Sequence, residues 1–209
     1  GVNVGITGRN EEHLKSTVAE LEKLGVKAAY SVFDVEEMAQ VEQGVASIAS
    51  QLGGIDILIN NAGVGDFGSF EDMPVETWEK VMKVNLFGVY YVAKATLPYL
   101  KQNKEGDIVN VASTAGLKGA PNMSAYCASK AAVISLSQSL MAELRKFNIR
   151  VITLTPSTIA TDMSIEGKLT DGNPEKVLQP EDFAEWVRDI LKMNRRAMIA
   201  SASIFSTNP

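Results

Sequence analysis

Short apolar runs alternate along this chain with segments whose apolar residues recur every three or four positions. The runs have the length and composition of buried strands, and the recurring segments have the spacing of amphipathic helices. Strands that alternate regularly with helices form a parallel sheet, because each helix carries the chain back to the edge where the next strand starts. The sequence therefore predicts an α/β fold, a doubly wound parallel sheet with helices on both faces.

The expected elements follow from where these patterns begin and end. Asn10 has the side chain of a helix N-cap, Gly25 suits a helix end, and Pro74 and Pro180 suit first helical turns. Strands are expected near residues 2–7, 27–34, 56–60, 108–113, 150–155 and 197–201. Helices are expected over residues 10–25, 38–52, 74–99 and 126–147, and from residue 180 onwards. No internal repeat or linker is found, so we expect a single domain over residues 1–209.

Composition is that of a globular protein, with 45% hydrophobic and 22% charged residues among 209. We expect no membrane span and no secretory signal, because no apolar run approaches the roughly 18 residues that cross a bilayer. The lone cysteine, Cys127, fits a reducing compartment, so a cytoplasmic location is expected. The net charge of −5 argues against a nucleic-acid partner. No metal is expected, because His13 is the only histidine and no residues have metal-ligand spacing.

One expected helix carries a tyrosine and a lysine that can act together on a carbonyl group. Tyr126 and Lys130 occupy positions i and i+4 and so share one helical face, while Ser113 closes an apolar run expected to be a buried strand. A free phenol has a pKa of about 10, and a nearby positive charge lowers it, so Lys130 is expected to favour the phenolate of Tyr126. The Ser113 hydroxyl can donate a hydrogen bond to a carbonyl oxygen. Alone, a tyrosine and a lysine at this spacing are more often a chance feature of a helix surface.

Further motifs accompany this pair. Residues 56–63 form a strand that runs into a tight Asn-Asn-Ala-Gly loop, Asn85 lies in the middle of a long helix, and residues 156–163 read Pro-Ser-Thr-Ile-Ala-Thr-Asp-Met. Together with the serine, tyrosine and lysine, these motifs resemble the short-chain dehydrogenase/reductase family. The resemblance covers nearly the whole chain and implies a Rossmann-like fold. Among the branches of the family, the chain looks most like the 3-oxoacyl-[acyl-carrier-protein] reductases of fatty acid biosynthesis.

The resemblance implies an oxidoreductase that interconverts a carbonyl and an alcohol by hydride transfer. Tyr126 would give its proton to the substrate oxygen, Lys130 would hold the cofactor ribose, and Ser113 would position the carbonyl. Asn85 matches the asparagine that holds a water in the family's proton relay. Its alternative is a polar residue that bonds to backbone and kinks the helix.

The expected cofactor is NADP(H). Arg9 follows the first expected strand, where NAD-preferring relatives tend to carry an acidic residue, and a guanidinium can pair with a 2′-phosphate. A solvated surface arginine is the alternative, so NAD(H) stays open. By resemblance, the other cofactor contacts would be Asp34 and Val35 at the adenine, Asn61, Ala62 and Gly63 at the adenosine ribose, Lys130 and Tyr126 at the nicotinamide ribose, and Pro156, Ile159 and Thr161 along the nicotinamide.

The glycine-rich turn that receives the pyrophosphate in such folds is not found. Residues 7–9 imitate its first part, but no later glycines follow, and the central strand of the family's sheet is also missing. We therefore expect an N-terminally incomplete domain whose sheet is divided into two halves. Residues 63–68 match the spacing G-x-G-x-x-G, but no helix is expected to open there, so they are not interpreted as a phosphate loop.

The substrate is the least defined part of the prediction. The branch resemblance favours a 3-oxoacyl thioester on an acyl carrier, with residues 164–179 as a mobile lid over it. Another small ketone or a sugar is the first alternative. A catalytically inactive, truncated or regulatory homologue is the second, although the serine, tyrosine and lysine are all present. Many relatives are tetramers built on two long helices, so a homotetramer is expected through residues 74–99 and 126–147.

Overall fold

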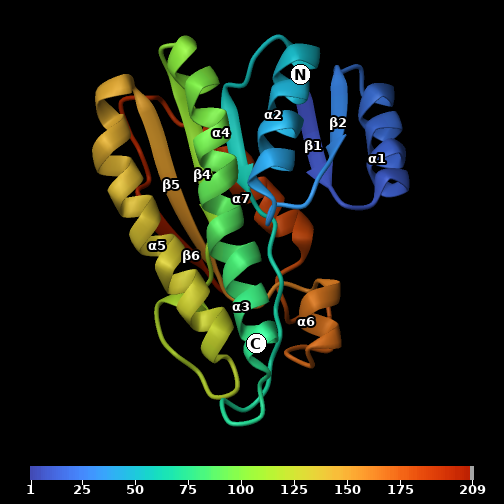
Figure 1. The fold of residues 1–209 in the computed structure, drawn as a ribbon, viewed down its shortest axis with the longest axis vertical. Coiled ribbons are helices and arrows are strands. Elements are labelled where there is room, and N and C mark those ends of the chain that lie inside the picture. The colour runs from blue at the N-terminus through green and yellow to red at the C-terminus, as the bar shows by residue number, and fades with distance from the viewer. Residues whose placement is uncertain (208–209) are drawn as a thin grey trace.

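The computed structural model describes residues 1–207 and shows parallel strands between layers of helices (Figure 1). The strands are β1 (Val4–Gly8), β2 (Ala28–Val32), β3 (Ile57–Asn60), β4 (Gly106–Val111), β5 (Ile149–Pro156) and β6 (Ser201–Ile204). The α-helices are α1 (Glu11–Lys23), α2 (Met38–Leu52), α3 (Val75–Met82), α4 (Gly88–Gln102), α5 (Ser124–Leu144), α6 (Asp162–Glu166) and α7 (Pro180–Lys192). In Figure 1, α2, α4 and α5 lie in front of the strands and α7 lies behind them. The predicted Rossmann-like α/β fold is confirmed.

Every strand pair is parallel, but the strands form two separate sheets. β3, β4, β5 and β6 are hydrogen-bonded in that order, and β1 pairs with β2 alone. Within residues 1–207 no ladder joins β1 to β3. This division agrees with the two halves expected from the missing central strand.

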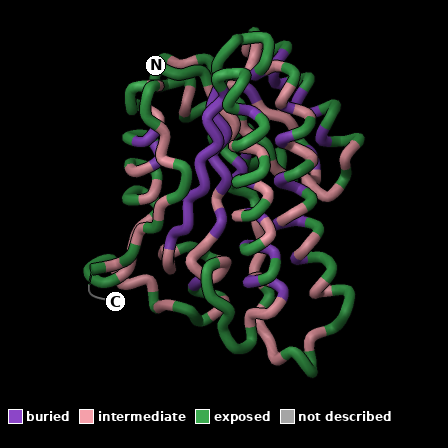
Figure 2. Tube along the Cα trace, turned by 90° about the vertical axis from the view of Figure 1, so that its left-hand side faces the viewer, coloured by how far each residue is buried: buried purple, intermediate pink, exposed green. Residues whose placement is uncertain are grey.

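Two hydrophobic clusters pack against opposite faces of the four-stranded sheet. Consecutive side chains of a strand point to opposite faces. In β5, Val151 packs with Leu100 of α4 and Leu144 of α5, whereas Ile152 packs with Val187 of α7. β5 is buried along its whole length because helices cover both of its faces, and Figure 2 shows the buried strands at the centre of the molecule.

Most helix ends lie where the sequence predicts them. The Asn10 side chain accepts a hydrogen bond of 3.1 Å from the backbone N–H of His13 and so caps α1. α7 begins at Pro180, and α2 has the predicted bounds. The long helix predicted over residues 74–99 differs, because a π-helical turn at Lys83–Phe87 separates α3 from α4. π-helical turns are uncommon in proteins, and many of those that occur lie at functional sites.

Two strand predictions are wrong in position. The strand predicted at residues 197–201 is β6 at Ser201–Ile204, because the backbone N–H of Ala197 bonds to the carbonyl of Asn194 and holds this segment in a turn. The strand predicted to end at Ser113 ends at Val111. Ser113 instead caps a 3-10 turn, and its Oγ accepts a hydrogen bond of 3.1 Å from the backbone N–H of Ala115. Ser113 thus belongs to the loop beyond the sheet edge.

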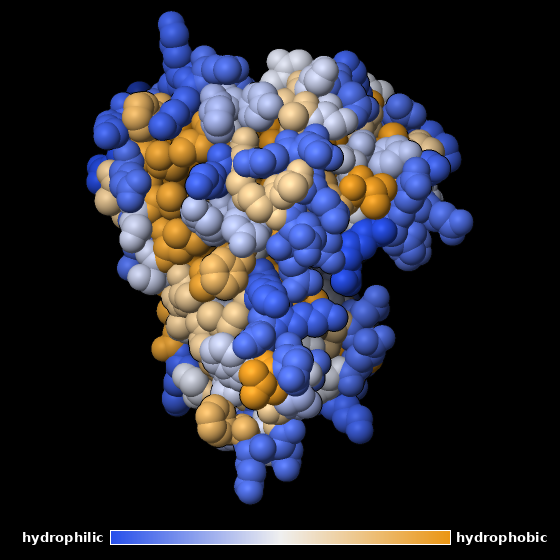
Figure 3. All heavy atoms as spheres, in the orientation of Figure 1, coloured by the Kyte–Doolittle hydropathy of each residue, from blue (hydrophilic) through white to orange (hydrophobic). Residues whose placement is uncertain are grey.

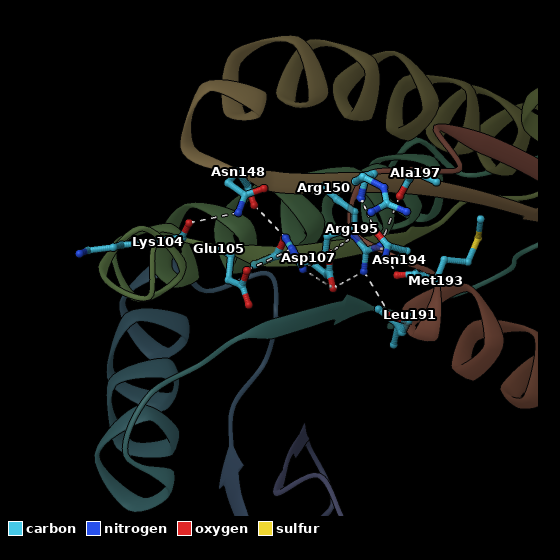
Figure 4. Close-up of polar contacts among 12 residues, drawn as sticks. Lys104, Glu105, Asp107, Asn148, Arg150, Leu191, Met193, Asn194, Arg195 and Ala197 are labelled. Atoms are coloured by element: carbon cyan, nitrogen blue, oxygen red, sulfur yellow. Dashed lines mark hydrogen bonds and ion pairs between the residues drawn. The ribbon is translucent and has the colours of Figure 1, made fainter.

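A buried ion cluster fastens the opposite, amino-terminal edge of the sheet (Figure 4). The Asp107 carboxylate at the start of β4 accepts two hydrogen bonds from Arg150 of β5, at 2.6 and 2.8 Å, and two from Arg195, at 3.3 Å. Arg150 also donates to the carbonyl of Met193 at 3.1 Å. The cluster therefore ties the connection between α7 and β6 to the sheet, away from the carboxyl-terminal ends of the strands.

Candidate active site

The predicted catalytic residues meet at the carboxyl-terminal edge of the four-stranded sheet. Ser113 follows β4, Tyr126 and Lys130 lie in the first half of α5, and Asn85 lies in the π-helical turn. Parallel strands end at the same edge, so residues that follow them are brought together. The structure places all four predicted residues in one region, although they are far apart in sequence.

Tyr126 is held in a largely apolar environment that favours its neutral form. Burial raises the pKa of the phenol, and the nearby Ser113 hydroxyl lowers it by less. The net shift is upward. The expectation that the neighbouring lysine would bring this pKa below its ordinary value is therefore wrong for this structure. Burial is the largest effect, and it could not be seen in the spacing of the two residues.

Lys130 is itself a buried base. Its Nζ donates a hydrogen bond of 2.9 Å to the carbonyl oxygen of Val111 and lies 5.7 Å from the centroid of the Tyr126 ring. Burial lowers the pKa of Lys130 from 10.5 to about 8. A lysine whose proton is loosely held in this way is a feature of sites where proton transfer occurs.

Asn85 is completely buried, and its amide holds the loop after β3. Oδ1 accepts a hydrogen bond of 2.8 Å from the backbone N–H of Val64, and Nδ2 donates to the Val64 carbonyl at 2.9 Å. Nδ2 also donates to Ser129 Oγ at 3.0 Å. Ser129 in turn donates to the carbonyl of Tyr126 at 2.8 Å. Asn85 therefore links the loop after β3 to α5, the helix that carries Tyr126. These contacts match the alternative given for Asn85, a polar residue that bonds to backbone.

Two glycines allow close approaches at this site. A Cβ on Gly116 would lie 2.7 Å from the backbone carbon of Lys130, so only glycine lets the loop after β4 pack directly on α5. A Cβ on Gly63 would lie 3.3 Å from Asn85 Oδ1 and 3.6 Å from Lys130 Nζ. Glycine at position 63 therefore lets the loop after β3 pass close to the Asn85 amide and the Lys130 ammonium.

The remaining predicted cofactor residues lie at the ends of other strands. Asn61 and Ala62 directly follow β3, while Ile159 forms a bridge with Leu178 and Thr161 caps α6 beyond Pro156 at the end of β5. Val35 packs against Gly88 of α4, and a Cβ added to Gly88 would lie 2.8 Å from the Val35 side chain.

Arg9 and Asp34 lie together at the edge of the two-stranded sheet. Nη1 of Arg9 is 3.8 Å from Oδ2 of Asp34, and the arginine side chain is 65% exposed. Asp34 Oδ1 also accepts a hydrogen bond of 3.0 Å from the backbone N–H of Glu36. Asp34 therefore forms a turn after β2, beside an arginine whose side chain reaches solvent.

Sequence reasoning missed three residues near the phenol. Ser129 joins Asn85 to the backbone of Tyr126, as described above, and Phe67 contacts the tyrosine ring with ring centroids 5.7 Å apart. Met163 of the short helix α6 lies beside Gly65, as Phe67 does: a Cβ added to Gly65 would be 3.1 Å from Met163 Sδ. The lid predicted over residues 164–179 begins inside this helix, which has a capping box formed by Thr161 and Ser164. The pattern Thr-x-x-Ser at this point was the available signal for α6.

Groups of residues able to hold a metal ion are not found among residues 1–207. In the same range, none of the helices is both long enough and apolar enough to span a membrane. The expectation that no metal takes part stays a prediction.

A Rossmann-like sheet with a serine, a tyrosine and a lysine at its carboxyl-terminal edge defines a class of oxidoreductases that use a nicotinamide cofactor. The family model described as short chain dehydrogenase matches residues 1–171. The chain belongs to this family.

Curated relatives of the chain differ in activity. The inactive 2-(S)-hydroxypropyl-CoM dehydrogenase 2 of Xanthobacter autotrophicus is 34% identical over 221 residues, which cover 100% of this chain and 94% of that protein. The 3-oxoacyl-[acyl-carrier-protein] reductase of Chlamydia muridarum is 36% identical over 165 residues, which cover 78% of this chain and 66% of that protein. The 3-oxoacyl reductases are thus one of several branches that this chain resembles.

Solved structures of the same fold hold either nicotinamide cofactor. An NAD+-bound xylitol dehydrogenase is 27% identical with a TM-score of 0.91, and the match covers 99% of this chain and 89% of that one. An actinorhodin polyketide ketoreductase with NADPH is 28% identical with a TM-score of 0.88, covering 97% of this chain and 86% of that one. The fold alone therefore does not decide between the two cofactors.

Proposed function

We propose that this protein is an NADP(H)-dependent reductase that converts a carbonyl to an alcohol, with Tyr126 as the proton donor. The observation that carries the proposal is the placement of Ser113, Tyr126 and Lys130 at one edge of the sheet. Burial raises the pKa of the phenol, so Tyr126 is protonated before the reaction, as a donor must be, but the same shift makes it a weaker acid.

Each residue has a distinct task in this reaction. The bound cofactor supplies the hydride that reduces the carbonyl carbon. Ser113 Oγ donates a hydrogen bond to the carbonyl oxygen and fixes its position, and the Tyr126 hydroxyl transfers its proton to that oxygen. Lys130 Nζ, which donates to the Val111 carbonyl in this structure, holds ribose hydroxyls and stabilises the phenolate left behind. Asn85 keeps the loop after β3 and the start of α5 in register through Val64 and Ser129.

The proton-transfer assignment is tested by NADPH oxidation with a panel of carbonyl substrates that includes acyl thioesters. Tyr126→Phe removes the hydroxyl and keeps the ring, and we expect a loss of about 100-fold or more in kcat, the size of a general acid's contribution. A circular dichroism spectrum matching that of the wild type serves as the control that the variant is folded. Retention of activity by this variant would refute the mechanism.

NADP(H) is proposed over NAD(H) because Arg9 is exposed and lies at the strand edge where the adenosine ribose is expected. Asp34 opposes this preference, since its carboxylate lies near the arginine and repels a phosphate. Arg9→Ala should therefore weaken NADPH binding by about tenfold and leave NADH binding nearly unchanged, as measured by calorimetry. An equal loss for both cofactors would contradict a 2′-phosphate contact.

A 3-oxoacyl thioester is the proposed substrate. The relative from Chlamydia muridarum supports it, and so do Phe67 and Met163, which put apolar surface near the phenol, where an acyl chain is favoured over a polyol. The xylitol dehydrogenase among the structural neighbours supports the alternative of a sugar or another small ketone. A substrate panel with matched acyl thioesters and sugars decides between them by kcat/KM.

An inactive homologue is the second candidate function, and the similarity to the inactive 2-(S)-hydroxypropyl-CoM dehydrogenase 2 of Xanthobacter autotrophicus favours it. Cofactor binding separates the two, because a thermal shift with NADPH is expected only if the site is assembled. If NADPH gives no shift and the whole carbonyl panel gives no turnover, the inactive candidate is supported.

A homotetramer formed through α4 and α5 is also proposed. The surface over these helices carries an apolar strip in Figure 3. Tyr90 of α4 is 41% exposed, and Phe87 and Phe147, in the turns directly before α4 and after α5, are 45% and 37% exposed. Apolar side chains gathered on one face support contact with another copy of the chain. Light scattering tests this assembly, and a monomer would contradict it.

A further inference from the structure

Phe67 connects three parts of the proposed active site. It lies in the loop between β3 and α3, and its ring meets the Tyr126 ring edge-on, with centroids 5.7 Å apart and planes at 74°. Such an edge-to-face contact is directional, so it restrains the orientation of the tyrosine ring as well as its position. The ring lies close to both Gly65 of its own loop and Gly167, the residue that ends α6.

Both glycines leave room for this ring. A Cβ on Gly65 would lie 2.7 Å from Cζ of Phe67, and a Cβ on Gly167 would lie 2.7 Å from its Cε2. Real Cβ atoms do not approach carbon this closely, so any other residue at either position displaces the aromatic ring. The ring therefore occupies a cradle that exists only because two distant residues lack side chains.

The cradle joins the lid to the rest of the site. On its own side, α6 is held by Ser164, whose Oγ donates to the carbonyl of Ile159 at 2.6 Å. The loop that carries Phe67 is tied to the segment before α5, since the backbone N–H of Gly68 donates to the carbonyl of Asn122 at 2.9 Å. The aromatic ring is thus placed between the lid and the start of the helix that carries the phenol.

We propose that Phe67 is a positioning residue that couples the α6 lid to the orientation of the Tyr126 phenol. This inference rests on the proposed function, because the orientation of the phenol matters only if Tyr126 donates a proton. The lid is held against the ring, and the ring holds the phenol, so displacement of either one disturbs the other.

The first test compares Phe67→Leu with Phe70→Leu. Phe70 lies on the same loop but is 81% exposed, so it is a matched control for the loss of a ring. We expect Phe67→Leu to lower kcat about fivefold, which is the effect that an aromatic pair can have on a reaction barrier. The fold increase in KM should be smaller than the fold decrease in kcat, because leucine still fills part of the apolar space. Phe70→Leu should match the wild type in both constants.

Trypsin gives a readout that does not depend on activity. Lys168 is exposed and directly follows Gly167, so release of the lid makes the bond after Lys168 easier to cut. In Phe67→Leu this cleavage, identified by mass spectrometry, should be about fivefold faster than in Phe70→Leu, with cleavage elsewhere unchanged. A general loss of stability would instead accelerate cleavage at all sites.

Gly65→Ala tests the cradle while keeping the aromatic ring. The added methyl group displaces Phe67, so kcat and cleavage after Lys168 should change in the same direction as in Phe67→Leu. In the double variant the two effects should not add, because leucine at position 67 removes the ring that the methyl group displaces.

The outcomes separate this inference from the proposed function. The coupling is refuted if Phe67→Leu and Gly65→Ala leave both kcat and the Lys168 cleavage rate at wild-type values. It is also refuted if these variants change one of the two rates and not the other. That result would leave the proposed function standing if Tyr126→Phe is inactive. If Tyr126→Phe stays active, the proposed function fails, and so does the coupling to proton donation, whatever the trypsin result.

Discussion

Replacing Lys130 by methionine is expected to stabilise the protein at neutral pH while removing its activity. Burial lowers the pKa of this amine from 10.5 to about 8, a difference of 10.5 − 8 = 2.5. Each pKa unit corresponds to about 1.4 kcal/mol, so the buried charge costs about 3 kcal/mol of folding free energy below pH 8. The lost hydrogen bond to the Val111 carbonyl offsets about 1 kcal/mol of this. The methionine variant should therefore be more stable by about 2 kcal/mol.

The pH dependence of this difference has a defined sign. Between pH 8 and 10.5 the unfolded chain holds a proton on Lys130 that the folded chain has released, so wild-type stability gains from this residue as pH rises. The advantage of Lys130→Met should shrink over the same range, vanish before its upper end and then reverse, because the gain of about 3 kcal/mol in wild-type stability exceeds the advantage of about 2 kcal/mol. Tyr126 is present in both proteins, so its own titration largely cancels from the comparison.

Urea denaturation followed by circular dichroism measures both free energies of unfolding at a series of pH values. Lys80→Met is a suitable control, because Lys80 is exposed on α3 and should show no such pH-dependent difference. If Lys130→Met is less stable than the wild type at neutral pH, or if the difference does not shrink as pH rises, the assignment of a buried, destabilising ammonium is wrong.

Two further predictions concern packing and ion pairing. Asp107→Asn leaves the buried Arg150 guanidinium without its carboxylate partner. The free energy of unfolding, measured with urea, should fall by about 3–5 kcal/mol. A fall of less than about 1 kcal/mol would contradict the role of the ion cluster. Gly116→Ala puts a methyl group 2.7 Å from the backbone of α5 and should cost about 1–3 kcal/mol together with activity. Gly119→Ala is its control, since nothing lies within 4 Å of that position; equal stability of the two variants would refute the close-packing argument.

The sequence determines the fold wherever the structural signal is local. The apolar spacing of α2, the capping side chain of Asn10 and the helix-starting Pro180 all act within a few residues, and all three predictions are confirmed. β6 was misplaced because its start depends on a turn at Asn194, next to Arg195, which bonds to Asp107. That contact joins residues far apart in the chain, and no local pattern records it.

The site shows the same limit in its chemistry. Spacing was enough to put Tyr126 and Lys130 on one helical face, but the direction of the phenol's pKa depends on burial, which only the packed structure defines. Several departures from ordinary local rules also gather at this edge: a buried lysine, a π-helical turn and a fully buried Asn85. Proteins keep such costly features where function needs them, so their convergence favours a working site. If Lys130→Met is indeed more stable yet inactive, stability and chemistry will have been shown to oppose each other at this one residue.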